Sequence, residues 1–202
     1  MALYHFSVRH VSRGKGQMVV ASAAYISGQR IFDSYYNKIH DYTSKSGVIF
    51  TEILTPEYVP ERLTDRETLW NEVEHVERNN KAQLAYSFDI ALQNELTLEE
   101  NIKLAKEFCQ EQFVARGMIV DLAVHEGKSD NEEEPDNPHF HVLVPIRPFT
   151  EEGIWGNKQR REYILDEDGN RVKDAKGKEM FNAVSTTGWN DPELLKEWRR
   201  AW

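Results

Sequence analysis

The chain has 202 residues, of which 40% are hydrophobic, one cysteine and a formal net charge of −9 at pH 7. This size predicts one domain with one sizeable core. The sequence has no signal segment and no run of roughly 20 apolar residues, so we expect no membrane insertion. Together with the lone cysteine, this predicts a cytoplasmic protein. The acidic total argues against a generic nucleic-acid binder, because such proteins gain affinity by releasing counterions from phosphates through Lys and Arg.

The N-terminal quarter predicts two strands around a helix. Alternation over residues 4–8 predicts the first strand, and a basic Arg-Gly-Lys-Gly turn at 13–16 follows it. A helical pattern then covers residues 17–31, with small residues that allow close packing and with Tyr25 in its middle. On this pattern alone, Tyr25 reads as an ordinary core aromatic residue. After a polar, loop-like stretch, residues 48–54 predict the second strand.

The middle of the chain alternates helices with strands. Two Thr-x-x-Glu capping boxes predict helices over residues 64–78 and 97–117. Residues 84–92 alternate as a strand between them, with Asp89 on the more polar face. Together with the N-terminal elements, this order predicts an α+β fold, an antiparallel sheet with helices packed mainly on one face.

Two further strands, over residues 121–125 and 139–146, carry three histidines. Side chains alternate between the faces of a strand, so His139 and His141 share one face while apolar residues occupy the other. The segment between the strands has the Gly, Pro, Asn and Asp content of a loop, and a hairpin would place His125 next to His139. Three neutral imidazoles on rigid elements match the coordination chemistry of one divalent metal ion. The other four histidines lie in separate segments without such spacing, and we interpret them as ordinary surface or core residues.

The chain then turns polar, and residues 151–188 predict an appended hairpin and loop. Turn signals at 166–169 and 176–177 separate short apolar runs. Pro192 begins a helix whose leucine and tryptophan residues would dock on a core, yet the chain stops in the middle of this pattern. We therefore predict that residues 1–202 form one domain from the N-terminal part of a longer protein.

Two basic segments weaken the objection that the acidic total raises against nucleic-acid binding. Residues 1–46 hold six Lys or Arg against two acids, a local charge of +4, and residues 158–161 form a second basic cluster. The candidates for contact with a nucleic-acid backbone are Arg9, Arg13, Lys15, Arg160 and Arg161. Tyr35, Tyr36 and Trp155 are candidates for stacking on unpaired bases.

Several segments, in the same order along the chain, closely resemble the MobA/MobL mobilisation relaxases. These segments are Tyr4–Phe6, Ala21–Tyr25, Ala91–Thr97, Arg116–His125, Asn137–His141 and Trp198–Arg199. Each is weak alone, and together they are specific over nearly the whole chain. The resemblance implies a DNA strand transferase of the HUH class, which nicks one strand at the transfer origin of a plasmid or integrative element and later religates it.

The resemblance also implies roles for individual residues. In that family, a tyrosine of the first helix attacks the scissile phosphate, becomes joined to the 5′ end and frees a 3′-hydroxyl group; the matching residue is Tyr25. A phenol, with an ordinary pKa of about 10, is a weak nucleophile at neutral pH and needs a cation or a base nearby. The family's metal ligands fall on His125, His139 and His141. The family works with magnesium or manganese, whereas three imidazoles favour zinc, nickel or copper on affinity, with cobalt as a further candidate.

One departure from the family concerns the strand at 84–92. Many members carry Arg-Glu where this chain has Tyr86-Ser87, and that glutamate assists near the active site. Asp89, two residues further along the same strand face, is our candidate for the missing carboxylate. The implied partners are single-stranded origin-of-transfer DNA, relaxosome accessory proteins and a coupling protein.

Three other interpretations stay open. Histidine-triad nucleotide hydrolases share the His-Phe-His pattern but carry a third histidine where this chain has Leu143. A rolling-circle replication initiator shares the metal site but carries its tyrosine after that motif, where this chain has only Tyr163. The non-enzymatic alternative is a metal-stabilised nucleic-acid-binding module in which Tyr25 is a core residue.

Overall fold

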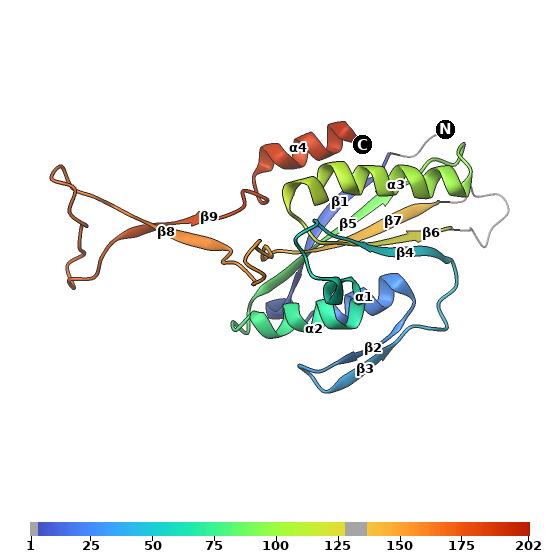
Figure 1. Cartoon of the computed structure of the whole chain (residues 1–202), viewed down its shortest axis with the longest axis horizontal. Coiled ribbons are helices and arrows are strands. Elements are labelled where there is room, and N and C mark those ends of the chain that lie inside the picture. Colours follow the sequence, from blue (N-terminus) through green and yellow to red (C-terminus); the bar gives the residue numbers. More distant parts are fainter. Residues whose placement is uncertain (1–3, 128–136) are drawn as a thin grey trace.

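A five-stranded antiparallel sheet forms the centre of the protein (Figure 1). The computed structural model describes residues 4–127 and 137–202. In spatial order, the strands are β1 (Phe6–Ser12), β5 (Gln83–Ala91), β7 (His139–Pro145), β6 (Val120–His125) and β4 (Val48–Leu54). Every neighbouring pair is antiparallel, so the predicted α+β class with an antiparallel sheet is confirmed.

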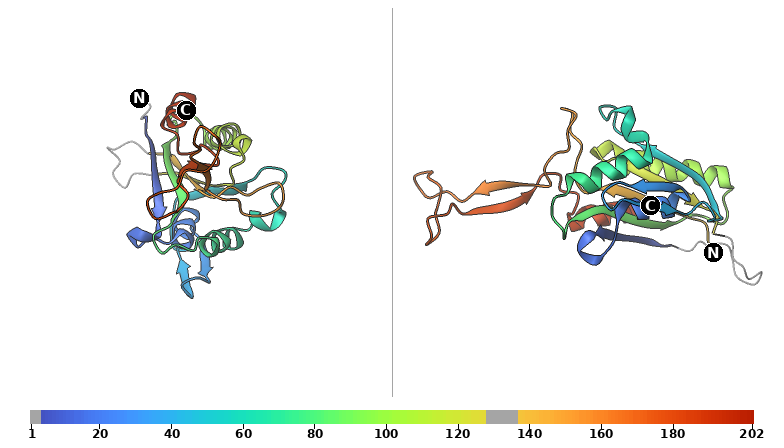
Figure 2. Two further views of the ribbon diagram at one scale, coloured as in Figure 1. Left: turned by 90° about the vertical axis from the view of Figure 1, so that its left-hand side faces the viewer. Right: turned by 90° about the horizontal axis from the view of Figure 1, so that it is seen from below.

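Helices cover both faces of this sheet (Figures 1 and 2). α1 (Val19–Ser27) and α2 (Arg66–Val76) lie on one face, and α3 (Leu98–Gln112) and α4 (Pro192–Ala201) lie on the other. Trp198 is buried in the core beneath α3 and α4, so the C-terminal helix docks as predicted. Within the described residues, no helix combines the length and the apolar character needed to cross a membrane.

The division of the helices over two faces corrects the prediction that they pack mainly on one. The central strands present buried side chains on both sides: Phe88 and Phe140 belong to the core beneath α3 and α4. Ala123 and Leu143, from the same group of strands, belong to the core beneath α1 and α2. Because strands that are apolar on both faces need a covering layer on each, the helices divide between the two sides.

Alternation along β7 separates its core side chains from its histidines. Three side chains on the α3 side are fully buried: Phe140, Val142 and Val144. His139 and His141 are half-buried on the opposite face, which is the face that α1 covers. The predicted assignment of the two faces is therefore confirmed.

Two hairpins stand outside the central sheet (Figure 1). β2 (Arg30–Asp33) and β3 (Lys38–Asp41) form the first hairpin, in a stretch for which we predicted only a loop. β8 (Gln159–Tyr163) and β9 (Phe181–Ser185) form a ribbon that extends away from the sheet and lies within the predicted appended segment (Figure 2). We call residues 159–185 the arm. Three short 3-10 helices complete the described elements: η1 (Arg13–Lys15), η2 (Glu61–Thr64) and η3 (Val114–Arg116).

Several predicted helix boundaries differ from the structure, and α2 and α3 end at Val76 and Gln112, before the predicted residues 78 and 117. α1 ends before Gly28, whose φ of 64° is the left-handed conformation that commonly ends helices, so residues 29–31 lie outside it. α2 is capped by Asp65 rather than by Thr64, because the Asp65 carboxylate accepts a hydrogen bond from the Thr68 N–H. The capping box at the start of α3 is present as predicted.

Candidate active site

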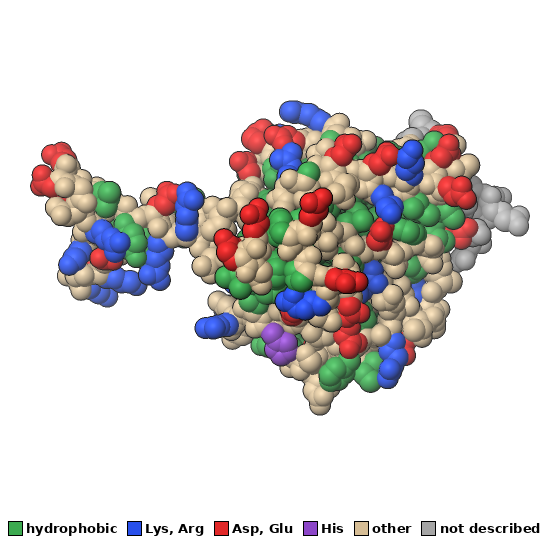
Figure 3. All heavy atoms as spheres, in the orientation of Figure 1, with side chains coloured by type: hydrophobic (Ala, Val, Ile, Leu, Met, Phe, Trp, Pro, Cys, Tyr) green, Lys and Arg blue, Asp and Glu red, His purple; other side chains and the backbone are tan. Residues whose placement is uncertain are grey.

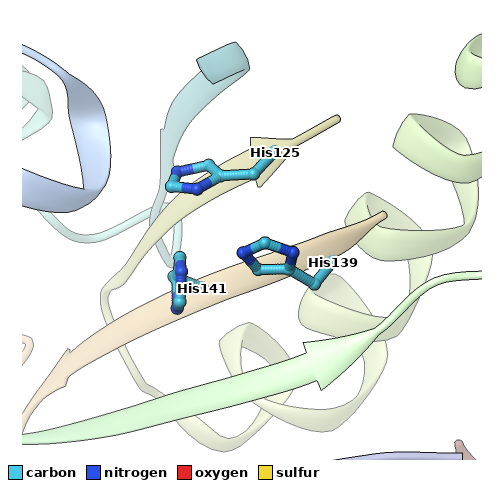
Figure 4. A group of neighbouring side chains, drawn as sticks. All are labelled: His125, His139 and His141. Atoms are coloured by element: carbon cyan, nitrogen blue, oxygen red, sulfur yellow. The ribbon is translucent and has the colours of Figure 1, made fainter. Parts of the chain in front are cut away.

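Three histidine rings from β6 and β7 meet on one face of the sheet (Figure 4). His125 lies directly opposite His139 in the β6–β7 register, and His141 follows two residues later on the same face. One nitrogen from each ring lies within 4.8 Å of the corresponding nitrogens of the other two. The predicted hairpin pairing, which brings these imidazoles together, is confirmed.

Backbone carbonyl groups orient two of the rings. His125 Nε2 lies 2.7 Å from the Ile26 carbonyl oxygen, and His139 Nδ1 lies 2.8 Å from the Asn137 carbonyl oxygen. A carbonyl oxygen only accepts hydrogen bonds, so each of these nitrogens is the donor, and in a neutral ring the other nitrogen keeps its lone pair. Metal-binding histidines in proteins use the same arrangement, in which the second nitrogen is held by an acceptor.

Two of the rings are neutral at pH 7. Burial is the largest of the effects that lower the pKa of His125 to about 4, and the charges of Lys45 and His139 act in the same direction. Burial is also the main cause of the lowering of the His141 pKa to about 4, which the Asp89 carboxylate opposes. Neutral imidazoles with available lone pairs on paired strands fit a divalent metal ion.

Tyr25 lies on the exposed side of α1 and lines the same cavity as the histidines. The residue is 49% exposed, which rules out the interpretation of Tyr25 as a core aromatic. Tyr25, His125, His139 and His141 line one cavity of about 370 Å³. The predicted nucleophile and the predicted metal ligands therefore border a common space.

A buried carboxylate anchors the N-terminal end of α1. Met18 occupies the N-cap position without a side-chain cap, and Glu74 of α2 instead accepts a hydrogen bond from the Val19 N–H at 2.9 Å. Glu74 also forms an ion pair with Arg13 at 2.6 Å, and both side chains are buried. Arg13 is therefore not available to a DNA backbone, which corrects its place among the predicted DNA contacts.

A second buried network anchors the C-terminal end of α1. Asp121 of β6 accepts hydrogen bonds from Arg66 Nη2 at 2.8 Å and from Trp70 Nε1 at 2.7 Å. Arg66 Nη1 donates in turn to Gln29 Oε1 at 2.9 Å, just beyond the end of α1. This network ties the helix that carries the tyrosine to the strand that carries His125.

Asp89 lies at the edge of the histidine cluster. It faces His141 directly in the β5–β7 register and is half-buried. It lines a cavity of about 520 Å³ together with Tyr25, His141 and Arg9. The structure thus places the predicted carboxylate opposite one imidazole and in the same cavity as the tyrosine.

The remaining basic candidates fall in two places. Arg9 is exposed on the edge strand β1 and lines the cavity that contains Tyr25, and Lys15 is exposed on η1. Arg160 and Arg161 are exposed on β8 of the arm. Figure 3 shows Lys and Arg side chains gathered along one side of this arm.

The aromatic candidates divide in the same way. Tyr35 and Tyr36 are exposed at the turn between β2 and β3. Trp155 is half-buried, donates from Nε1 to Glu72 at 2.9 Å and packs edge-on against Phe149 with ring centroids 5.2 Å apart. Trp155 is therefore committed to contacts within the protein, which corrects its prediction as a stacking residue.

Sequence reasoning missed two residues that shape the site. Lys45 donates a hydrogen bond to the Tyr25 carbonyl oxygen at 3.0 Å, and Glu74 holds the start of α1. Neither belongs to a recognisable motif, and Glu74 meets Arg13 across 61 positions of the chain. No local pattern signals contacts of this kind.

The sequence profile of the MobA/MobL family matches residues 17–202. The chain belongs to the MobA/MobL family. This MobA/MobL member is 35% identical to "Conjugal transfer protein TraA" of Agrobacterium fabrum over 202 residues, which cover 94% of the chain and 18% of that relative. It is 36% identical to "Probable mobilization protein MobA" of Bifidobacterium longum over 174 residues, which cover 85% of the chain and 30% of that relative. The chain therefore spans 18% and 30% of the length of these two relatives.

A solved structure shares the fold of this MobA/MobL member. It is described as "Molecular Basis of Vancomycin Resistance Transfer in Staphylococcus aureus" and matches with a TM-score of 0.79 at 34% sequence identity. The match covers 100% of the chain and 89% of that structure. The overall fold is thus shared over the full length of the chain.

Proposed function

We propose that this MobA/MobL member is a relaxase that nicks one DNA strand at a transfer origin and later reseals it. The observation that carries the proposal is the common cavity of Tyr25 and the three histidines. The mobilisation and conjugal-transfer names of its relatives support the same reaction class. The half-exposed Tyr25 argues against a binding module in which this tyrosine is a core residue. If the chain were a rolling-circle initiator, its nucleophile would be Tyr163, which lies on β8 of the arm.

In the proposed reaction, the phenolic oxygen of Tyr25 forms a bond to the phosphorus of a backbone phosphodiester, and the bond from phosphorus to O3′ breaks. The Tyr25 proton passes to a base, for which Asp89 is our candidate, and the departing oxygen takes up a proton to become a free 3′-hydroxyl group. The 5′-phosphate stays on Tyr25 as a diester. Because this linkage keeps the energy of the cleaved bond, attack by the 3′-hydroxyl group reverses the reaction and reseals the strand.

The histidines have a binding role in this proposal. His125, His139 and His141 would hold a divalent metal ion, which when bound supplies Lewis-acid charge at phosphate oxygens. The carbonyl groups that hold His125 and His139 fix the orientation of each ring and leave its other nitrogen for the metal ion. We propose magnesium or manganese as the working ion, with zinc, nickel and cobalt as competitors that imidazole ligands favour.

The proposed substrate is single-stranded DNA from the transfer origin. Arg9 lines the cavity that contains Tyr25, so it would contact phosphates close to the cleaved bond. Arg160 and Arg161 would contact DNA further away along the arm, and Lys15 would do so from η1. Accessory proteins of a relaxosome and a coupling protein complete the proposed set of partners, in the cytoplasm where the DNA of the element is processed.

A covalent-adduct assay tests the proposal. The protein is incubated with a labelled single-stranded oligonucleotide from the transfer origin and with Mg²⁺ or Mn²⁺, and the products are separated on a denaturing gel. We expect a protein-linked band that disappears in Tyr25→Phe and persists in Tyr163→Phe, the matched control. An adduct that survives Tyr25→Phe but not Tyr163→Phe would instead support a rolling-circle initiator, and the absence of any adduct from the wild-type protein would contradict both.

A further inference from the structure

Lys45 lies on the wall of the cavity that holds Tyr25 and the histidines, and the reaction described above does not use it. Its Nζ lies 3.7 Å from the centroid of the Tyr25 ring and 3.0 Å from the Tyr25 carbonyl oxygen, to which it donates a hydrogen bond. The same cavity is lined by His125, His139 and His141. A positive charge therefore borders the space in which the tyrosine and the histidine cluster meet.

This charge is partly withdrawn from water, and no carboxylate of the described residues forms an ion pair with it, although Glu126 lines the same cavity. Burial lowers the pKa of Lys45. The ion pairs formed within residues 4–127 and 137–202 do not include Lys45. By contrast Lys158, which is also withdrawn from water, pairs with Glu77 at 2.9 Å. Because an ammonium group away from water is costly unless an anion accompanies it, the cavity favours an anion beside Lys45.

Backbone hydrogen bonds hold Lys45 in place relative to α1. The Tyr42 N–H donates to the Gln29 carbonyl oxygen at 3.2 Å, and the Lys45 N–H donates to the Tyr42 carbonyl oxygen at 2.9 Å. The Tyr42 ring also packs edge-on against Tyr25, with centroids 5.4 Å apart. The loop that carries Lys45 is thus attached to the same helix end as the tyrosine, so its ammonium group is positioned before any ligand arrives.

We propose that Lys45 binds a non-bridging oxygen of the phosphate that Tyr25 attacks, as a second cationic group of the site beside the histidine cluster. This inference rests on the proposed function and adds a substrate contact to it. An ammonium group has three donors, so a phosphate oxygen can be bound while the Tyr25 carbonyl contact persists. Negative charge increases on the phosphate oxygens as the phenol attacks, and a preorganised cation stabilises that charge.

The first test combines a change of charge in the protein with a change of charge in the DNA. In a Tyr25→Phe background, which prevents cleavage, binding is measured for two origin oligonucleotides, one with a normal phosphate and one with an uncharged methylphosphonate at the nick. We expect Lys45→Met to weaken binding of the normal oligonucleotide about tenfold or more, and to leave binding of the methylphosphonate oligonucleotide unchanged. Lys45→Arg, which keeps the charge, should retain most of the affinity.

The control variant is Lys38→Met, which removes a lysine exposed on β3 and should bind both oligonucleotides like the parent protein. Melting temperatures of all variants show whether a loss of binding reflects a loss of folding. An equal loss on both oligonucleotides, or no loss on either, would overturn the assignment of Lys45 to the scissile phosphate.

A second test does not depend on nicking. The wild-type protein is prepared with lysines labelled with ¹³C at Cε, the Lys45 signal is assigned by its absence in Lys45→Arg, and inorganic phosphate is added. We expect the Lys45 signal to shift with phosphate while the Lys38 signal stays constant. If phosphate shifts Lys45 but no Tyr25 adduct forms on origin DNA, the anion site holds and the relaxase proposal fails. If the adduct forms but phosphate does not shift the Lys45 signal and Lys45→Met binds the normal oligonucleotide like the parent protein, the relaxase proposal holds and this one fails.

Discussion

Asp89 and Ser87 lie on the same face of β5, and both line the cavity that contains Tyr25. The resemblance to the family implies a glutamate at the position of Ser87, and the carboxylate of this chain lies two residues further along the strand. Because side chains two residues apart point to the same face, the carboxylate stays in the cavity. It lies opposite His141, where it can accept a proton in the neighbourhood of the tyrosine.

We expect Asp89→Asn to lower the rate of single-turnover DNA cleavage by about 100-fold, at the lower end of the range for loss of a general base. Binding of the origin oligonucleotide should persist, because the amide keeps the size of the side chain. The double variant Asp89→Asn/Ser87→Glu returns a carboxylate to the same face and should recover much of the lost rate. Cleavage by Asp89→Asn at the wild-type rate across pH would remove Asp89 from the mechanism.

His139 offers a way to test metal binding without disturbing α1. His125 also contacts the Ile26 carbonyl oxygen, so its removal would loosen the helix as well as the cluster. A metal ion present at about 100 times its dissociation constant should raise the free energy of unfolding of the wild-type protein by about 2.7 kcal/mol. His139→Ala should lose most of this increase, measured by urea unfolding with Mn²⁺ or Zn²⁺ and with a chelator.

The matched control for that measurement is His75→Ala, which removes an exposed histidine of α2. It should respond to the metal like the wild-type protein. If His139→Ala and His75→Ala gain equal stability from the metal, the ion binds elsewhere and the histidine cluster is not its site.

At the scale of elements, the position of α1 depends on side chains that other elements supply. Glu74 of α2 replaces the N-cap that Met18 lacks, and the buried Arg13 neutralises it. Arg66 and Asp121 hold the opposite end. A short helix with only nine residues has little stability of its own, so these contacts define where its tyrosine lies.

We expect Glu74→Gln to lower the free energy of unfolding by about 3 kcal/mol, because it leaves the charge of Arg13 buried without a counter-charge. Cleavage at a temperature where the variant is folded should also slow, since a neutral amide holds the Val19 N–H at the start of α1 less strongly than a carboxylate does. The measurement is urea denaturation, with Glu107→Gln as the control. Glu107 forms an exposed pair with Lys103 on α3, and its loss should cost less than about 1 kcal/mol. Equal effects of the two substitutions would show that the Glu74 network does not stabilise α1.

The same elements show how much of this fold the sequence predicts. The histidine hairpin follows from strict alternation over a few residues, and this local signal predicted the strands, their faces and their pairing. The β2–β3 hairpin was missed because apolar and polar residues do not alternate cleanly along its two short strands. Arg13 was wrongly predicted as a DNA contact because its partner Glu74 is distant in the sequence, and no local pattern shows that a basic residue is buried.

At the scale of the whole molecule, the acidic total charge and the proposed DNA binding are reconciled by where the charges lie. In Figure 3, Asp and Glu side chains are spread over the body and also lie at the tip of the arm, whereas Lys and Arg side chains gather along one side of the arm. Lys158 at the base of the arm pairs with Glu77 at 2.9 Å, and Arg147 pairs with the same carboxylate at 3.0 Å. These ion pairs fix the base of the arm to the segment that follows α2, so the arm presents its charges in a defined direction.

We expect DNA binding to weaken as salt is added, because local basic residues release counterions whatever the total charge. If Arg160 and Arg161 each contact one phosphate of single-stranded DNA, Arg160→Gln/Arg161→Gln should reduce the slope of log affinity against log salt by about 1.4. The control is Lys103→Gln/Lys196→Gln, which removes two exposed charges from α3 and α4 and should leave the slope unchanged. The affinities are measured by fluorescence anisotropy in the Tyr25→Phe background over a series of salt concentrations. Equal slopes for the arm variant and the control would show that the arm does not contact the DNA backbone. If binding by the wild-type protein did not change with salt, the proposed role of all the local basic residues would be contradicted.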